Sequence, residues 1–211
     1  MEINESFLSL QGEGPLSGRL TYFVRSSGCN LRCEYCDTKY AYGDGEDYSI
    51  DTIIENIVNS GAKNVCITGG EPLMNPDTDS LANALIENGY NVDLETNGSL
   101  PLPDWVKDEH VIVAMDIKCP SSGMADEMLF DNIGLLSSKD IVKFVIGSNE
   151  DYEYAKKVSE LITEAKIYFH PVFGSFEPKE LAENIIRDKL DNVVFGLQIH
   201  KVIWQPDTRG V

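Results

Sequence analysis

The stretch Gly28-Cys29-Asn30-Leu31-Arg32-Cys33-Glu34-Tyr35-Cys36-Asp37-Thr38 contains three of the five cysteines of the chain. Thiolates spaced Cys-x3-Cys-x2-Cys, with no fourth Cys or His close behind, fit a [4Fe-4S] cluster that keeps one iron open for a ligand. A zinc knuckle would need a fourth protein ligand, and packing as small hydrophobes is the other alternative. We therefore expect Cys29, Cys33 and Cys36 to bind a cluster within a loop over residues 28–42.

The composition is that of an ordinary globular protein of 211 residues, 42% hydrophobic and 25% charged. We expect a single domain over residues 1–211. The sequence has no apolar run of about 18 residues and no secretory signal, and an odd number of cysteines favours a metal site over disulfides. These features predict a cytoplasmic protein that does not interact with membranes.

The net charge is strongly negative, at -18, from 17 basic and 35 acidic side chains. Nucleic-acid binding depends on clustered Lys and Arg, so this balance argues against a nucleic-acid partner. The substrate is expected to be a small molecule, with any anionic group bound by a locally placed Arg or Lys.

Predicted strands and helices alternate along the chain. After an extended segment at 2–9, β-rich apolar runs predict strands at 20–26, 65–68, 92–94, 111–117, 141–146, 167–169 and 193–197. Apolar residues at helical spacing predict helices over 50–58, 81–86, 154–162 and 181–186, the first capped by Ser49 and ended by Gly61. This alternation indicates βα units and a parallel sheet. Fewer than eight such strands favour an open, partial TIM-like barrel over a closed one.

Polar residues gather where these strands are predicted to end. In both doubly wound sheets and βα barrels, ligands bind at the carboxyl ends of the strands. The residues expected at that rim are Arg25, Gly69, Gly70, Glu71, Thr96, Asn97, Asp116, Lys118, Lys143 and His170. The cluster loop leaves the first core strand on the same side, so one shared site is predicted.

The cysteine triplet followed by Gly69-Gly70-Glu71-Pro72 resembles the radical S-adenosylmethionine (SAM) superfamily. The resemblance implies that the open iron of a [4Fe-4S] cluster chelates SAM, whose reductive cleavage yields a 5'-deoxyadenosyl radical. Glycines without side chains allow close backbone approach, and Glu71 is expected to accept from the SAM ammonium. The SAM-binding residues that the resemblance implies are Tyr35, Asp37, Gly69, Gly70, Glu71, Asn97, Asp116, Ile117, Lys118, His170, Pro171, Val172 and Phe173. Many relatives carry Gln where this chain has His170.

A narrower resemblance extends from about residue 3 to about 206. It rests on Ser9-Leu10-Gln11-Gly12-Glu13-Gly14, Phe23-Val24-Arg25, Cys36-Asp37-Thr38, Asp116-Ile117-Lys118-Cys119-Pro120 and Leu197-Gln198-Ile199-His200-Lys201. These segments are similar to the 7-carboxy-7-deazaguanine synthase family of SAM- and Mg-dependent lyases. The activity implied is conversion of 6-carboxy-5,6,7,8-tetrahydropterin to 7-carboxy-7-deazaguanine, with loss of ammonia, in queuosine and archaeosine precursor synthesis.

The implied substrate site combines an anion-binding residue with several polar groups for the pterin edge. Arg25 suits the substrate carboxylate, because its planar fork binds a carboxylate at two points. The substrate-binding residues expected are Leu10, Gln11, Gly12, Glu13, Arg25, Thr68, His200 and Pro206. Thr38, with Asp37 acting through water, is expected to bind Mg²⁺, although a turn cap is the alternative for both. No catalytic residue is expected beyond these ligands, and Cys66 and Cys119 are interpreted as non-ligands.

Two other functions remain open at this point. A glycyl-radical-enzyme activase would share the cysteine triplet, but it would leave Gln11, Arg25, Thr38 and His200 unexplained. A non-catalytic zinc or iron-sulfur module would have no use for the glycine pair at a strand end. The resemblance further implies a homodimer, an electron donor protein such as flavodoxin or ferredoxin, and a tail over residues 198–211 that closes the pocket.

Overall fold

The computed structural model of the chain describes residues 1–43, 45–206 and 208–211. Asp207, the first residue of the tail beyond Pro206, lies outside the described residues. The described residues form one nine-stranded sheet in the order β3-β1-β2-β4-β5-β6-β7-β8-β9. The strands are β1 (Glu2–Leu10), β2 (Leu20–Ser26), β3 (Glu46–Asp47), β4 (Asn64–Gly69), β5 (Asn91–Thr96), β6 (Val111–Ile117), β7 (Ile141–Ile146), β8 (Lys166–Pro171) and β9 (Val193–Phe195).

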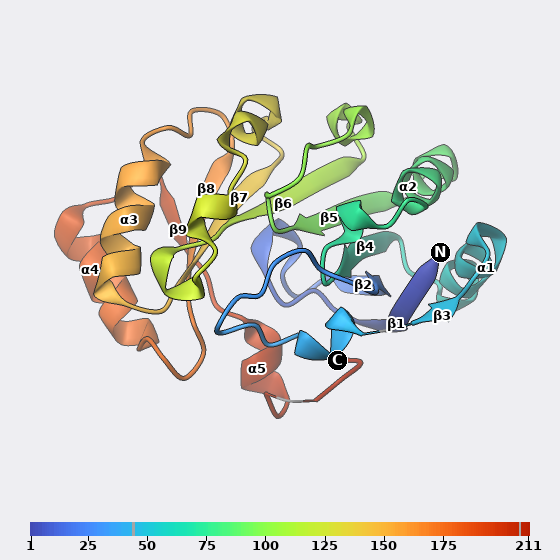
Figure 1. Ribbon diagram of the computed structural model, residues 1–211, viewed down its shortest axis with the longest axis horizontal. Helices are drawn as coiled ribbons and strands as arrows, with labels where there is room; N and C mark the ends of the chain where they lie inside the picture. Colours follow the sequence, from blue (N-terminus) through green and yellow to red (C-terminus); the bar gives the residue numbers. More distant parts are fainter. Residues whose placement is uncertain (44, 207) are drawn as a thin grey trace.

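The strands from β2 through β9 are parallel, apart from the short β3. The strand β1 pairs antiparallel with β2, and β3 pairs antiparallel with β1. The sheet curves without closing (Figure 1), because β3 and β9 end the strand order at opposite edges. The predicted open α/β barrel is confirmed.

Four helices connect consecutive parallel strands: α1 (Ile50–Ser60), α2 (Thr78–Glu87), α3 (Asn149–Ser159) and α4 (Pro178–Asp188). The predicted cap of α1 is present, since the Ser49 side chain accepts from the Thr52 amide at 3.1 Å, and Gly61 follows with φ of 72°. Shorter turns of 3-10 helix occupy Gly14–Leu16, Lys39–Tyr42, Pro72–Met74, Asp104–Lys107, Pro120–Ser122, Ala125–Glu127 and Phe130–Leu135. None of the described helices has the length and apolarity needed to span a bilayer.

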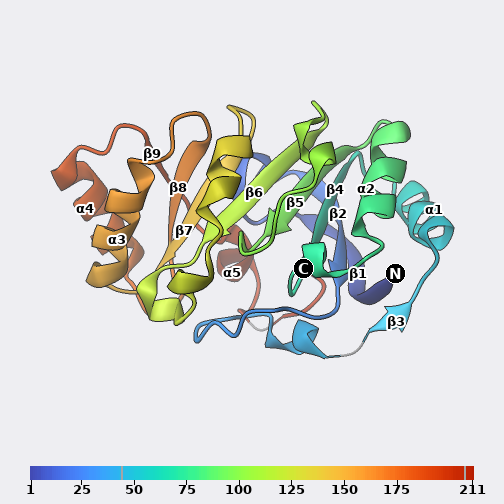
Figure 2. The same ribbon diagram turned by 45° about the horizontal axis from the view of Figure 1, so that its top comes forward.

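The helices α1 to α4 cover the outer face of the curved sheet, whereas the short helix α5 (Ile199–Ile203) lies on its inner side (Figures 1 and 2). The core lies between sheet and outer helices, where Val24, Ile67 and Leu94 are fully buried. Since strand side chains alternate between faces, Phe23 and Arg25 point to the inner side. The strands thus supply the core with one face and the site with the other.

The element boundaries differ from the predictions at several ends. The strands β5 and β8 are longer than predicted, so Glu95, Thr96 and His170 belong to strands, and Lys143 lies in the middle of β7 rather than at its end. The helix α3 stops at Ser159, and Leu161 beyond it is exposed. The strand β9 is shorter than predicted. Connections from β5 to β6 and from β6 to β7 contain 3-10 turns in place of α-helix.

Candidate active site

A cavity of about 560 Å³ opens on the inner side of the sheet. Three walls surround it: the cluster loop, the strands, and the segment 198–211, which we call the tail. Residues predicted for the site that line the cavity are Leu10, Gln11, Gly12, Glu13, Arg25, Cys29, Cys33, Tyr35, Cys36, Asp37, Thr38, Thr68, Gly69, Gly70, Asn97, Asp116, Lys118, Val172, Phe173, His200 and Pro206. Four predicted residues lie outside its lining: Glu71, Ile117, His170 and Pro171.

The three loop cysteines are free, partly exposed thiols facing this one cavity. Burial raises the pKa of both Cys29 and Cys33 above the ordinary thiol value. Among the described residues, no three His, Cys, Asp or Glu side chains converge as ligands of a single metal ion do. A [4Fe-4S] cluster takes each cysteine on a different iron, so three separated thiols around one cavity fit it. Cys66 and Cys119 are fully buried.

The glycine pair packs directly against the cluster loop. A Cβ on Gly70 would collide with the Gly28 carbonyl oxygen and lie 2.7 Å from the Cys29 Cβ. The loop is fastened here by the Glu71 amide, which donates to the Gly28 carbonyl at 2.9 Å. Because Gly70 has no side chain, the end of strand β4 can pack directly against Gly28 and Cys29. This packing role adds to the predicted close approach of the backbone to SAM.

Glu71 lies beneath the cavity rather than in it. Its carboxylate accepts from the Thr96 hydroxyl at 2.8 Å, the Asn97 amide at 2.7 Å and the Leu73 amide at 3.0 Å. Burial raises the pKa of Glu71 to about 7 although these donors oppose the shift. The expectation that Glu71 accepts from the SAM ammonium is therefore not supported by its placement, since its oxygens already bind the adjoining strand end.

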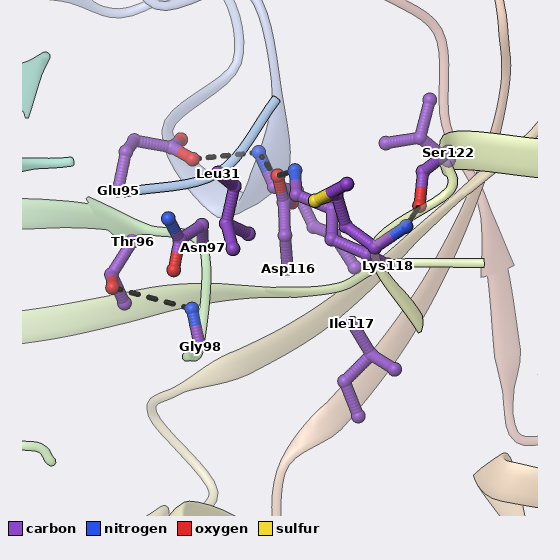
Figure 3. A network of polar contacts seen from close by, with 12 residues as sticks. Leu31, Glu95, Thr96, Asn97, Gly98, Asp116, Ile117, Lys118 and Ser122 are labelled. Carbon is purple, nitrogen blue, oxygen red and sulfur yellow. Dashed lines mark hydrogen bonds and ion pairs between the residues drawn. The ribbon is translucent and has the colours of Figure 1, made fainter. Parts of the chain in front are cut away.

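A buried ionic network lines the cavity, with the Lys143 ammonium at its centre. Figure 3 labels Glu95, Asp116 and Lys118 of this network. The Lys143 ammonium lies 2.6 Å from a Glu95 oxygen, 2.9 Å from a Glu13 oxygen and 3.4 Å from Asp116 Oδ1. The other Asp116 oxygen pairs with Lys118 at 2.6 Å. In Figure 3 the Ile117 side chain turns away from this group, consistent with its burial in the core.

The network holds more carboxylates than ammonium groups, so its members differ in protonation. Burial raises the pKa of Glu95 to about 8 and that of Asp93 to about 6, while Lys143 opposes both shifts. The pKa of Asp116 is lowered because Lys118 and Lys143 outweigh its burial. At neutral pH Glu95 thus keeps its proton beside ionised neighbours.

Gln11 and His170 are less available than predicted. The Gln11 amide donates to Asp93, and its carbonyl accepts from the Gly12 amide at 2.8 Å, so its side chain organises the loop as well as lining the cavity. His170 is 1% exposed, with its Nδ1 atom 3.9 Å from Glu13. Neither ring nitrogen has a hydrogen-bond partner among the described residues, and burial lowers the pKa of this imidazole. Of the predicted 170–173 segment, only Val172 and Phe173 line the cavity.

Arg25 lies in a corner formed with two residues that the sequence analysis did not identify. Its Nε atom donates to Glu5 at 2.8 Å, and the Tyr40 hydroxyl donates to the same carboxylate oxygen at 2.8 Å. Glu5 is the cross-strand partner of Arg25 in the antiparallel pair of β1 and β2. The guanidinium edge beyond Nε therefore remains directed at the cavity lining, with Nη1 3.5 Å from the Gly69 carbonyl.

The tail supplies the remaining wall. The Ile199 amide donates to the Gly12 carbonyl at 3.1 Å, and the Gln198 amide group donates to Glu13 at 2.8 Å. The His200 ring packs so closely on Gly12 that a Cβ there would overlap it. Lys201 pairs with Asp37 of the cluster loop, which also accepts from Thr38 at 2.9 Å.

Tyr35 and Asn97 link the walls to one another. The Tyr35 hydroxyl donates to the Val145 carbonyl at 3.2 Å, which places the ring along the cavity. The Asn97 amide donates to Asn30 at 3.1 Å and lies 3.8 Å from the Cys29 sulfur. Both side chains therefore connect the cluster loop to strand ends, in keeping with the shared site predicted from the rim.

An open parallel barrel with three thiols and a glycine pair at one rim defines the radical SAM class. The Radical SAM superfamily matches residues 23–118, which include the cysteines, the glycine pair and Asp116 to Lys118. The chain belongs to the 7-carboxy-7-deazaguanine synthase family. It is 39% identical to the 7-carboxy-7-deazaguanine synthase of Clostridium acetobutylicum, over 100% of this chain and 99% of the relative. It is 42% identical to the 7-carboxy-7-deazaguanine synthase of Methanospirillum hungatei, over 98% of this chain and 86% of the relative.

Solved structures share the fold. QueE from Escherichia coli superposes with a TM-score of 0.74 at 23% identity, covering 93% of this chain and 92% of that one. SuiB from Streptococcus suis, bound to S-adenosylmethionine, gives a TM-score of 0.61 at 15% identity, covering 83% and 46%. At these identities the likeness concerns architecture, so the roles of individual residues depend on the site itself.

Proposed function

We propose that the chain is a radical SAM lyase that converts 6-carboxy-5,6,7,8-tetrahydropterin to 7-carboxy-7-deazaguanine with release of ammonia. The observation that carries this proposal is full-length identity of 39% to a 7-carboxy-7-deazaguanine synthase in a chain whose cysteines, glycine pair and Arg25 share one cavity. An activase would need a surface for a protein substrate, and a non-catalytic module would not require this cavity.

The cofactors proposed are a [4Fe-4S] cluster held by Cys29, Cys33 and Cys36, and SAM bound beside it. When bound, they supply the 5'-deoxyadenosyl radical that abstracts hydrogen from the substrate. Tyr35, Asn97 and Lys118 line the cavity together with the cysteines, Asn97 at 3.8 Å from the Cys29 sulfur, and suit the adenosine and carboxylate of SAM. The network around Lys143 excludes water from the floor and holds a proton on Glu95 beside the bound substrate.

The substrate is proposed to lie between Arg25 and the central network. The free edge of the Arg25 guanidinium suits the carboxylate of the pterin. At the other end, Glu13 is an acceptor for the amino groups of the pyrimidinone ring. The half-buried Thr68, the cross-strand partner of Arg25, lines the same cavity. Strands β2 and β4 thus fix the orientation of the substrate.

Mg²⁺ is proposed to bind Thr38, with Asp37 contributing through water. Both residues line the cavity, and oxygen donors of this kind suit a hard cation that keeps several waters. The Lys201 ammonium now paired with Asp37 must share that carboxylate with the hydrated ion. Thr38→Ala should raise the Mg²⁺ concentration needed for half-maximal activity by about tenfold. A Mg²⁺ titration of wild type and variant that overlays would remove Thr38 from the site.

Assembly and partners complete the proposal. We propose a cytoplasmic homodimer that receives electrons from a flavodoxin or ferredoxin and feeds a queuosine or archaeosine pathway. Analytical ultracentrifugation of the purified chain tests the dimer, and reduction of the cluster by each donor, followed spectroscopically, tests the partner.

The decisive experiment is an anaerobic assay of reconstituted protein with reductant, SAM, Mg²⁺ and the carboxylated tetrahydropterin. Equimolar ammonia and 7-carboxy-7-deazaguanine are expected. Cys33→Ala should abolish both products and the cluster absorbance, while Cys119→Ala, a buried thiol outside the cavity lining, should retain the absorbance. SAM cleavage without a deazapurine would overturn the assignment.

A further inference from the structure

The tail residue Arg209 meets Arg25 at one corner of the cavity. Its Nε atom lies 3.4 Å from Glu5 Oε2, on the carboxylate whose other oxygen binds Arg25. Its guanidinium carbon sits 4.0 Å from the centre of the Tyr40 ring, and Nη2 donates to Asn4 at 3.1 Å. Both arginines line the cavity. We call Glu5, Arg25, Tyr40 and Arg209 the arginine corner.

The arginine corner carries a surplus positive charge in a chain whose net charge is -18. It contains two guanidinium groups and one carboxylate, and burial with the neighbouring Glu5 raises the pKa of Tyr40 to about 12, which keeps the phenol neutral. Glu5 Oε1 already accepts from both Arg25 and Tyr40. One further anion would balance the corner, and the cavity is the side from which it can enter.

We propose that Arg209 is a positioning residue for the anionic end of the substrate. By sharing Glu5, it weakens the hold of that carboxylate on Arg25 and leaves the guanidinium edge of Arg25 available for a second carboxylate. Binding of a pterin-6-carboxylate and seating of the tail are thereby coupled. This inference rests on the proposed function for the identity of the ligand.

The contacts of Arg209 with Glu5 and Tyr40 are of a kind that can form and break readily. Its side chain is 52% exposed, whereas those of Arg25 and Glu5 are 15% and 13% exposed. A half-exposed ion pair and a cation–π contact are individually weak, so Arg209 itself is held by several small contributions. The bound carboxylate adds a strong charge-assisted partner at the same corner.

The test compares two pterins that differ in charge at one position. Equilibrium binding of 6-carboxypterin and of unsubstituted pterin is measured by fluorescence on the full, cluster-reconstituted chain without reductant. Arg209→Gln should weaken 6-carboxypterin binding about tenfold and pterin binding less than twofold, while Arg209→Lys should retain part of the difference. In turnover, KM should rise with little change in kcat.

Arg187→Gln is the matched control, since Arg187 is 62% exposed on α4 and pairs with Asp188 away from the cavity. It should bind both pterins like wild type. The inference would be overturned if Arg209→Gln weakened the binding of both pterins equally, or left the binding of 6-carboxypterin unchanged. It would also be overturned if the wild type did not bind 6-carboxypterin more tightly than pterin. If the preference is seen but no deazapurine forms, the proposed function fails and the inference stands.

Discussion

Two walls of the cavity bind charge in different ways. On the strand wall, Lys143 and its carboxylate partners come from β5, β6, β7 and the loop after β1, and the Lys143 side chain is only 6% exposed. On the tail wall, Lys201 and Arg209 pair with Asp37 and Glu5; the Lys201 side chain is 9% exposed, whereas that of Arg209, nearer the end of the tail, is half exposed. The strand wall is a permanent part of the fold, whereas the Arg209 contact on the tail wall is one that water and salt can replace.

The difference separates two tasks that one site must combine. Buried charges at the strand ends fix the positions of groups around the reacting molecules, because no solvent competes with them. The half-exposed ion pair of Arg209 contributes little stability, so the end of the tail can leave and return with a small loss of free energy. Substitutions on the strand wall should therefore damage both folding and activity, and those on the tail wall should alter ligand binding alone.

The largest effect is expected for Lys143→Met. Removal of the ammonium leaves the ionised carboxylates of Glu13 and Asp116 without this buried partner, and breaking a buried pair typically costs about 3–5 kcal/mol. Urea unfolding should show this loss, and the folded fraction should lack activity. Lys107→Met, on an ion pair whose side chains are 61% and 96% exposed, should change stability by less than about 0.5 kcal/mol. If Lys143→Met and Lys107→Met had similar free energies of unfolding, the stabilising role of the buried network would be contradicted.

A pH-dependent effect is expected for Glu95→Gln. The pKa of Glu95 is about 8 in the folded chain against an ordinary value of 4.5, so the folded state favours the protonated form. Wild type should therefore lose stability relative to the variant as pH rises from about 5 to about 8, by at most about 1.4 kcal/mol per pH unit. Unfolding midpoints across this range measure it. Parallel curves would mean that Glu95 titrates normally.

The smallest effect is expected for Lys201→Gln on the tail wall. Loss of the pair with Asp37 should raise KM by about two- to fivefold without lowering the unfolding midpoint. The wild-type KM should increase with salt, and that of the variant should respond less, because screening acts on the pair that was removed. Lys179→Gln, at a side chain that is 85% exposed on α4, is the control. A lower unfolding midpoint in Lys201→Gln would place the tail in the folding core.

The sequence predicted the strands of the parallel sheet because each is a short apolar run bounded by glycine or polar residues. The predicted strand ends were wrong where polar residues continue a strand, as Glu95 and Thr96 do in β5. The alternation of Asp93 and Glu95 with apolar neighbours is the available signal for an inward polar face, and a strand predicted over 92–94 ends before Glu95 and so does not include it. In β7, the same alternation of faces predicts that the Lys143 side chain lies on the inner face of the sheet.

Contacts between distant segments were not predictable in the same way. Glu5 lies opposite Arg25 only because β1 pairs antiparallel with β2, and nothing local in the sequence sets that register. Asp37 and Lys201 are 164 positions apart, and their pairing depends on where the tail returns after β9. Burial also altered roles that the motif suggested, since Glu71 and Gln11 bind the protein itself.

The return of the tail to the N-terminal loop also affects the order of events during synthesis. Gln198 contacts Glu13 across 185 positions, and Arg209 contacts Asn4 across 205. Residues beyond 197 leave the ribosome after all nine strands, so the sheet can form while its inner side is still uncovered. A sheet that forms in this interval has its cavity and thiols still open to solvent. Of the three walls of the site, the tail is therefore the one whose contacts form last during synthesis.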